Sequence, residues 1–254
     1  MMRLTINQLL LTLFLIGFTG KIVAQTTRAR DLSLWPWLQV EWNLKKKQYV
    51  EFQYQARFNE NISQFNRSNL YFIYGKSIGK RWQFETLYQA NLNHFINQNT
   101  LFAGVTYKKK LPGPFSLYYR TAFQYIRNSF TGIYTVDHPY LEWRNRLRFI
   151  YRMNNLFSTS ISAEPYLRFN TQDPTHFTRI RYVWNVSYAF NKYQNFTVFY
   201  LIQPDISYST LPKTNYAIGL TYHIRIPDKT KDFQKFFNPK SLDSKGDNDK
   251  DTQN

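Results

Sequence analysis

The chain has 254 residues, of which 43% are hydrophobic and 19% aromatic, and its formal net charge is +17. This aromatic content excludes intrinsic disorder for most of the chain, because disordered segments are poor in aromatic residues. The sequence contains no cysteine, which excludes a disulfide framework, a thiolate zinc site and a cysteine nucleophile.

The N-terminal segment, residues 1–24, has the pattern of a cleavable signal peptide. Arg3 supplies a positive charge, the run from Leu9 to Phe18 is apolar, and Ala24 is a small residue at the expected cleavage point. A membrane-spanning helix needs about 20 apolar residues, and this run is shorter. We therefore expect an exported protein whose signal peptide is removed.

After the signal peptide, apolar and polar residues alternate along successive segments that are separated by turn residues. Val50–Asn59 is a clear example, and the last such segment ends near Ile226. Alternation gives a strand one apolar and one polar face. Crossing a bilayer takes about 9–11 residues of tilted strand, whereas strands of soluble domains usually have about 5–6. Because most segments are long, the sequence predicts an all-β fold, a single antiparallel transmembrane β-barrel over residues 25–226.

The same alternation also fits a soluble sandwich or a lipocalin-like barrel, in which the apolar faces point inward. We favour the membrane barrel because the chain has 20 Tyr and 6 Trp. Their rings suit the aromatic girdles of a membrane interface, whereas a packed interior would need a partner for every O–H and N–H group. Short connections also alternate with mostly longer ones, which is typical of outer-membrane barrels with periplasmic turns and outer loops.

The strand count is the uncertain part of this prediction. Eleven alternating segments can be counted from Leu34 onward, whereas single-chain bacterial barrels normally have an even number. Either Leu34–Asn43 does not cross as a full strand, or a further strand precedes it near Thr26–Ser33. The sequence therefore predicts a barrel of 10 or 12 strands. Residues 227–254 lose the alternation and are expected to form a polar, disordered tail.

Three stretches carry a resemblance to a known family: WPWLQVEWNLKKKQYVEFQYQARFNE, DHPYLEWRNRLRFIYR and TNYAIGLTYHIRI. Over roughly residues 30–226 the chain resembles the domain of unknown function 2490 family, which occurs mainly in Bacteroidetes. Its motifs include an arginine that closes the second strand, here Arg57, and a His-Arg pair where this chain has His138-Pro139. The resemblance implies an outer-membrane β-barrel of a Gram-negative bacterium and no agreed biochemical activity.

Arginine is prominent on the polar strand faces, while lysine is concentrated in the turns. The charged residues expected to line the barrel interior are Glu51, Arg57, Glu85, Arg120, Glu142, Arg144, Arg146, Arg148, Glu164, Arg168, Arg179, Arg181, Asp205 and Arg225. Several arginines on one face repel one another unless carboxylates or anions lie opposite. Two interpretations stay open: an Arg–carboxylate network that fills and stiffens the lumen, or an anion-favouring pore or binding site.

The sequence thus predicts an outer-membrane β-barrel protein with a structural, binding or small-solute permeation role, the last with a preference for anions. The expected partners are outer-membrane lipid, lipopolysaccharide and anionic small solutes, and not nucleic acid. The alternative is a lipid A- or phospholipid-modifying enzyme with a site at the outer rim, for which His138, Asp137 and Ser129 are the candidate catalytic residues. No sequence pattern for a metal or cofactor site is present, so none is expected.

Overall fold

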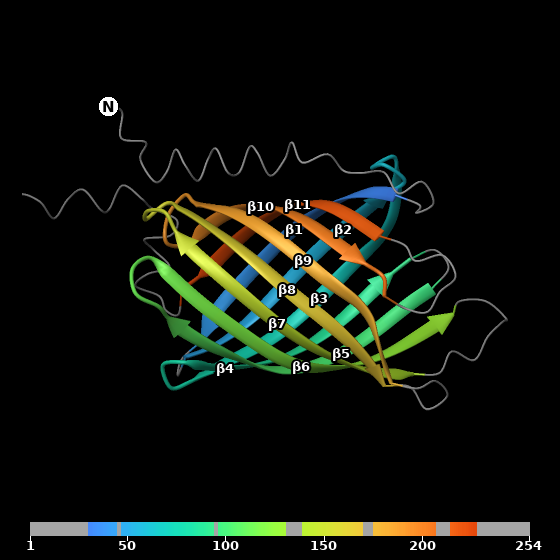
Figure 1. Cartoon of the computed structure of the whole chain (residues 1–254), viewed down its shortest axis with the longest axis horizontal. Helices are drawn as coiled ribbons and strands as arrows, with labels where there is room; N and C mark the ends of the chain where they lie inside the picture. The colour runs from blue at the N-terminus through green and yellow to red at the C-terminus, as the bar shows by residue number, and fades with distance from the viewer. Residues whose placement is uncertain are drawn as a thin grey trace, which may run out of the picture.

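The computed structural model describes residues 30–44, 47–93, 96–130, 139–169, 175–206 and 214–227. The described residues form eleven strands that close into one barrel, with the strands inclined to the barrel axis (Figure 1). The strands are β1 (Arg30–Leu44), β2 (Gln48–Asn59), β3 (Gln64–Ile78), β4 (Trp82–Leu92), β5 (Ile96–Lys110), β6 (Phe115–Phe130), β7 (Tyr140–Arg152), β8 (Phe157–Phe169), β9 (His176–Ala189), β10 (Gln194–Pro204) and β11 (Thr214–Ile226). Among these residues no helix is long and apolar enough to cross a membrane. The predicted signal peptide and the predicted tail after Pro227 lie outside the described residues.

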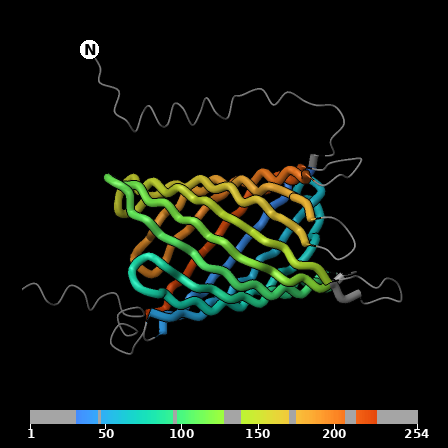
Figure 2. Tube along the Cα trace, turned by 60° about the horizontal axis from the view of Figure 1, so that its bottom comes forward, coloured from blue at the N-terminus to red at the C-terminus, as the bar shows by residue number. Residues whose placement is uncertain are grey.

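The barrel closes through a parallel pair of strands. Consecutive strands pair in antiparallel fashion, whereas β1 and β11 run in the same direction, with Arg30 beside Thr214 and Trp42 beside Ile226 (Figure 2). The prediction of 10 or 12 strands is therefore wrong, because the barrel has eleven. The even count assumed that the first and last strands meet in antiparallel fashion. A parallel seam instead joins an odd number of strands and leaves no free sheet edge.

The segment that the sequence suggested was incomplete is the full strand β1, which has 15 residues. Because the strand count is odd, β1 starts at one end of the barrel and β11 finishes at the other. The turn end of the barrel has the connections 45–47, 79–81, 111–114, 153–156 and 190–193, and the loop end has 60–63, 93–95, 131–139, 170–175 and 205–213. Only the last three of the loop-end connections are longer than those of the turn end.

The outward face of the wall is apolar. Phe72, Leu101, Leu147 and Ile161, from four different strands, are between 51% and 59% exposed. By the alternation of the faces, and among residues whose side chains are described, the charged side chains on the outward face are Lys76, Lys109 and Arg127, all near strand ends. The apolar faces thus point outward, opposite to the arrangement of a soluble sandwich.

Polar groups on the outer wall find partners within the wall itself. The indole Nε1 of Trp143 donates to the hydroxyl of Thr121 at 2.8 Å, and that of Trp184 donates to the hydroxyl of Thr159 at 2.9 Å. An unpaired N–H group in an apolar medium would cost free energy comparable to a lost hydrogen bond. These pairs let the aromatic side chains face an apolar environment without an unsatisfied donor.

The inward face is polar and buried over most strands, but the seam is apolar. Trp35, Phe199, Leu201 and Ala217 form a buried cluster on β1, β10 and β11. The ring of Phe199 lies over Gly219, where an added Cβ would be only 1.8 Å from a ring carbon. Glycine is therefore needed at this position for the ring to lie against the strand.

Candidate functional site

The charged interior follows directly from strand alternation. On β7, Glu142, Arg144, Arg146 and Arg148 share one face, and the other face is apolar apart from Asn145. Because the apolar face points outward, all four charged side chains point into the barrel. The interior of a small barrel is narrow enough for side chains on different strands to meet.

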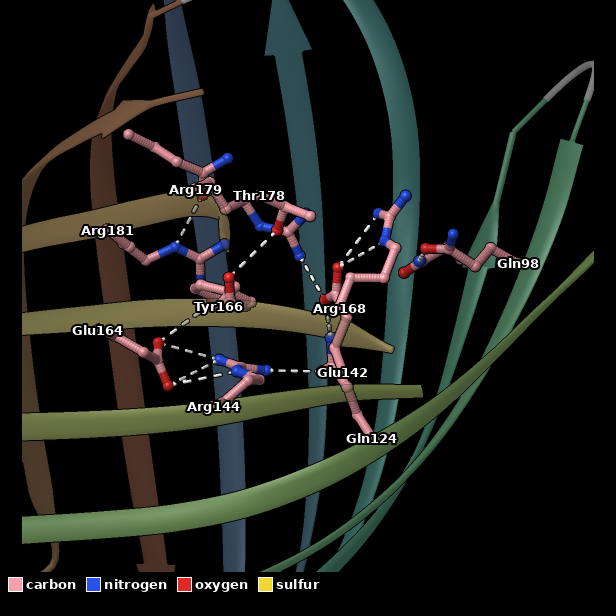
Figure 3. Close-up of polar contacts among 12 residues, drawn as sticks. Gln98, Gln124, Glu142, Arg144, Glu164, Tyr166, Arg168, Thr178, Arg179 and Arg181 are labelled. Carbon is pink, nitrogen blue, oxygen red and sulfur yellow. Dashed lines mark hydrogen bonds and ion pairs between the residues drawn. The ribbon is translucent and has the colours of Figure 1, made fainter. Parts of the chain in front are cut away.

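Glu164 on β8 is the first centre of this interior. Its carboxylate accepts a hydrogen bond from Arg120 Nη2 at 2.6 Å. Arg144 Nη2 lies 3.0 Å from each carboxylate oxygen, and Figure 3 shows this pair. The hydroxyl of Tyr166 donates to Glu164 Oε2 at 3.1 Å. The Glu164 side chain is only 4% exposed, so its charge is balanced by two arginines from the neighbouring strands β6 and β7.

Glu142 on β7 is the second centre and is fully buried. Its carboxylate accepts from Arg168 Nη2 at 3.1 Å, Arg179 Nη2 at 2.9 Å and Gln124 Nε2 at 2.6 Å. The amide oxygen of Gln124 accepts from Arg144 Nη1 at 2.9 Å, which links the two centres. We call the linked residues the carboxylate network: Arg120, Gln124, Glu142, Arg144, Glu164, Tyr166, Arg168 and Arg179. All of them except Arg120 are labelled in Figure 3.

The ring of Tyr166 packs against several of these cations. The guanidinium carbons of Arg144 and Arg179 lie 4.6 Å and 4.2 Å from the ring centroid, and that of Arg181 lies 5.3 Å away. Tyr166 is only 1% exposed. Each cation is attracted to the face of an aromatic ring, most strongly where water is excluded. Tyr166 therefore separates arginines that would otherwise repel one another.

A second group of arginines has no such carboxylates. Arg57 on β2 and Arg67 on β3 are directly opposite in register. Arg57 donates from Nε to Gln55 Oε1 at 2.8 Å and its guanidinium lies 4.0 Å from the ring of Trp35. Neither arginine takes part in any of the ion pairs found among the described residues. We call Arg57 and Arg67 the unpaired arginines.

Three carboxylates lie near the turn end of the interior, together with inward lysine and arginine side chains. Glu41, Glu51 and Glu85 each lie three residues from the turn end of their strands. Glu41 is opposite Glu51 in register and pairs with Arg225 Nε at 2.8 Å. The hydroxyl of Tyr49 donates to Glu85 at 2.6 Å. These three carboxylates therefore lie near the turn end of the barrel, while the unpaired arginines lie near the loop end.

The structure places most of the residues expected to line the interior on the inward face, in three groups. The first group belongs to the carboxylate network and consists of Arg120, Glu142, Arg144, Glu164, Arg168 and Arg179. The second group projects beside the network and forms no ion pair among the described residues: Arg146, Arg148 and Arg181. The third group lies near the turn end: Glu51, Glu85 and Arg225. Arg57 is one of the unpaired arginines. Asp205 follows β10 and forms an isolated bridge with Arg179.

Sequence reasoning missed Glu41, Arg67 and Tyr166. The signal for Glu41 was available, since it alternates with apolar residues in the segment that was suspected of not crossing. Arg67 was harder to place, because a register shift beside Arg57 displaces the loop end of β3 relative to β2. Tyr166 occupies an inward position on β8, where an aromatic residue would usually be expected on the apolar face.

The candidate catalytic residues of the enzymatic alternative cannot be located. Asp137 and His138 lie outside the described residues, and Ser129 belongs to β6 with its side chain undescribed. That alternative stays a prediction. Within the described ranges no group of three or more His, Asp and Glu could hold a metal ion.

Comparisons with known proteins bear on the architecture. No family model matches the sequence, and no curated protein matches it. Among solved structures, the barrel is similar to one described as "NanC porin structure in rhombohedral crystal form", with a TM-score of 0.48 and 9% identity over 74% of this chain and 91% of that chain. The similarity is loose and concerns the arrangement of strands alone.

Proposed function

We propose that the protein is an outer-membrane β-barrel that uses its arginine-rich interior to bind and admit small anions. The observation that carries this proposal is the segregation of the two strand faces. Described strands have apolar outward faces with charges only near their ends, and inward faces on which partly buried arginines meet buried carboxylates. This alternation of apolar-out and polar-in is that of transmembrane β-barrels.

The exposed apolar area supports a membrane environment. Large apolar side chains such as Phe72 on β3, Leu101 on β5 and Ile161 on β8 are all more than half exposed. Soluble monomers rarely expose continuous apolar patches of more than a few hundred Å². An apolar wall around the barrel is stable in hydrocarbon, where the exported protein would meet outer-membrane lipid and lipopolysaccharide, with the turn end in the periplasm.

The charge of the interior supports a preference for anions. Arg57, Arg67, Arg146, Arg148 and Arg181 point inward and form no ion pair among the described residues. Rings of cationic side chains favour anions in narrow passages. The carboxylate network joins β6, β7, β8 and β9 inside the barrel, which favours small solutes over a wide diffusion pore.

The membrane part of the proposal is tested by placing one charge at two depths of the outer wall. Leu147→Arg puts a cation near the middle of β7, and Ile78→Arg puts one at the turn end of β3; the two residues are 51% and 57% exposed. A lipid-facing arginine costs about 2–4 kcal/mol at the midplane and about 0–1 near the interface. Unfolding from lipid vesicles in denaturant should show this difference, and equal small effects would contradict a membrane-spanning wall.

The anion part is tested by the conductance of the refolded protein in a planar lipid bilayer under a KCl gradient. We expect small conductance steps and a reversal potential of the sign set by chloride. A reversal potential set by potassium would contradict the anion preference. Absence of conductance, with the folded protein confirmed by its heat-modifiable migration in gels, would contradict permeation and leave a binding or structural role.

A further inference from the structure

The unpaired arginines lie in a group of buried polar side chains on the inward faces of β1, β2 and β3. We propose that this group binds a small oxyanion, a carboxylate or a phosphate group, between Arg57 and Arg67. This inference rests on the proposed function, because it names the site and the chemical class of the anion that the interior would admit.

Charge is the first argument for a bound anion. Arg57 and Arg67 are cross-strand partners, and like charges directly opposite each other on a sheet are destabilising. Arg57 donates to the neutral amide of Gln55, and its guanidinium lies over the ring of Trp35. Both arginines are partly buried, and a charge withdrawn from water without a counter-ion is unfavourable. An anion between the two arginines would therefore lower the free energy of the folded protein.

The amides next to the arginines are the second argument. Gln55 and Asn69 are opposite in register and both are 0% exposed. Gln55 Oε1 accepts from Asn69 Nδ2 at 2.7 Å and from Tyr71 OH at 3.2 Å, in addition to Arg57. Its amide oxygen is thus fully used. The Gln55 Nε2 donor is left buried without a partner.

Unsatisfied atoms of this group are mostly donors. The buried donors without a partner are Gln55 Nε2, Arg67 Nε, Trp35 Nε1 and Trp37 Nε1, and the buried acceptor without a partner is Asn69 Oδ1. Buried polar groups are nearly always hydrogen-bonded, to protein, water or a bound ion. Four donors, one acceptor and two positive charges fit a ligand that is anionic and rich in acceptor oxygens.

Carboxylate and phosphate groups match this arrangement best. Guanidinium groups bind both in a bidentate manner, through charge-assisted hydrogen bonds. The stacked rings of Trp37 and Tyr71, whose centroids are 5.5 Å apart, form an apolar side to the group. A halide has no substituent to place there and no pair of oxygens to offer a guanidinium group. Hydrogen phosphate in addition carries a hydroxyl that can donate to Asn69 Oδ1.

The test is a titration of the full chain, refolded in detergent, with sodium phosphate and separately with sodium acetate at constant ionic strength. Calorimetry gives the affinity. A change in the tryptophan fluorescence of the chain, to which Trp35 and Trp37 contribute among six tryptophans, gives a second signal. The test variant is Arg57→Gln/Arg67→Gln. The matched control is Arg81→Gln/Arg152→Gln, which changes the net charge equally at exposed positions near the turn end.

We expect the test variant to bind at least about tenfold more weakly than the wild type, and the control to bind as the wild type does. Binding of only one of the two anions would assign the site to that group. Equal binding by the test variant and the control, or no binding of either anion by the wild type, would overturn the proposal. If the test variant does not fold, Arg67→Lys replaces it, since it keeps the charge and removes the bidentate geometry.

Failure of this inference is distinguishable from failure of the proposed function. The titration is made in detergent and needs no passage across a membrane. Oxyanion binding that depends on Arg57 and Arg67, together with a cation-selective or absent conductance, would contradict the proposed anion permeation and still support the proposed binding site. If the conductance is anion-selective and the test variant binds oxyanions as tightly as the wild type does, the proposed binding site is contradicted and the proposed anion permeation is supported.

Discussion

Two groups of inward arginines, drawn from the same residue type and the same barrel, differ in what surrounds them. In the carboxylate network, Glu142 and Glu164 each receive two arginines at 2.6–3.1 Å. The unpaired arginines on the opposing strands β2 and β3 have amides and indole rings as neighbours instead. Arginine in the first group is a part of the wall, whereas arginine in the second is available to a ligand.

This contrast shows that the net charge of an interior says little until the partners are known. The carboxylate network is locally rich in positive charge, yet each carboxylate is shared so that its arginines are held in place. A buried pair of this kind is not a large net source of stability, but removing one partner strongly destabilises the fold because the other charge stays buried. The two groups should therefore respond in opposite ways to neutralisation.

The largest expected effect is that of Glu142→Gln. The substitution removes the charge that balances Arg168 and Arg179, while the side chain keeps its size. Breaking a buried ion pair in this way typically costs about 3–5 kcal/mol. Denaturant unfolding of the refolded protein in lipid vesicles measures the loss. Glu60→Gln, at an exposed position of the loop after β2, is the control, and a similar small effect of both variants would mean that the network does not hold the wall.

A direct comparison of the two groups uses one arginine from each. Arg144→Gln removes the partner of Glu164 and should lower the free energy of unfolding by about 2–4 kcal/mol, because one arginine then balances the carboxylate alone. Arg67→Gln removes a like charge opposite Arg57 and should leave stability unchanged or raise it, by up to about 1 kcal/mol. The same unfolding measurement serves for both. Equal losses would remove the distinction between the groups.

Much of the barrel could be predicted from the sequence, because strand alternation is a local property. Inward placement of Arg144, Arg146 and Arg148 follows from their spacing alone. The closure could not be predicted, since whether β1 meets β11 in parallel depends on pairing between the two ends of the chain. Odd and even strand counts look the same in the alternation of any one segment.

The sequence also could not predict which of the interior charged residues form ion pairs with one another. Glu164 meets Arg120, 44 residues away, only because β6, β7 and β8 are neighbours with a particular register. The register shift near Arg57 decides which residue of β3 lies opposite it. Alternation identifies which side chains point inward, whereas register and barrel geometry decide which of them are compensated.

Tyr166→Phe probes how the carboxylate network separates its cations. The variant keeps the ring against Arg144 and Arg179 and removes the hydroxyl that donates to Glu164. A hydrogen bond to a charged group contributes about 1.5–3 kcal/mol, so a loss in this range is expected. The matched control is Tyr119→Phe on the outer wall, whose hydroxyl donates to Asn145 with both groups exposed. An equal loss in both variants would show that the buried position of Tyr166 is without consequence.

The smallest effect is expected at the turn end, where Arg225 pairs with Glu41. The Arg225 side chain is 44% exposed, so water and salt screen the pair, and exposed pairs contribute only about 0.2–1 kcal/mol. Arg225→Gln should therefore lower the free energy of unfolding slightly at low salt and leave it unchanged at 1 M salt, where the screening length is about 3 Å. Glu142→Gln should keep most of its larger effect at both salt concentrations, because the Glu142 carboxylate is fully buried and ions in solution do not reach it. Unfolding at the two salt concentrations measures the difference, and a salt-independent loss for Arg225→Gln would place this pair with the buried network. The three arginine settings then form one series: buried and paired, buried and unpaired, and exposed and paired. In this barrel burial and partner decide the role of an arginine, and its position on the inward face alone does not.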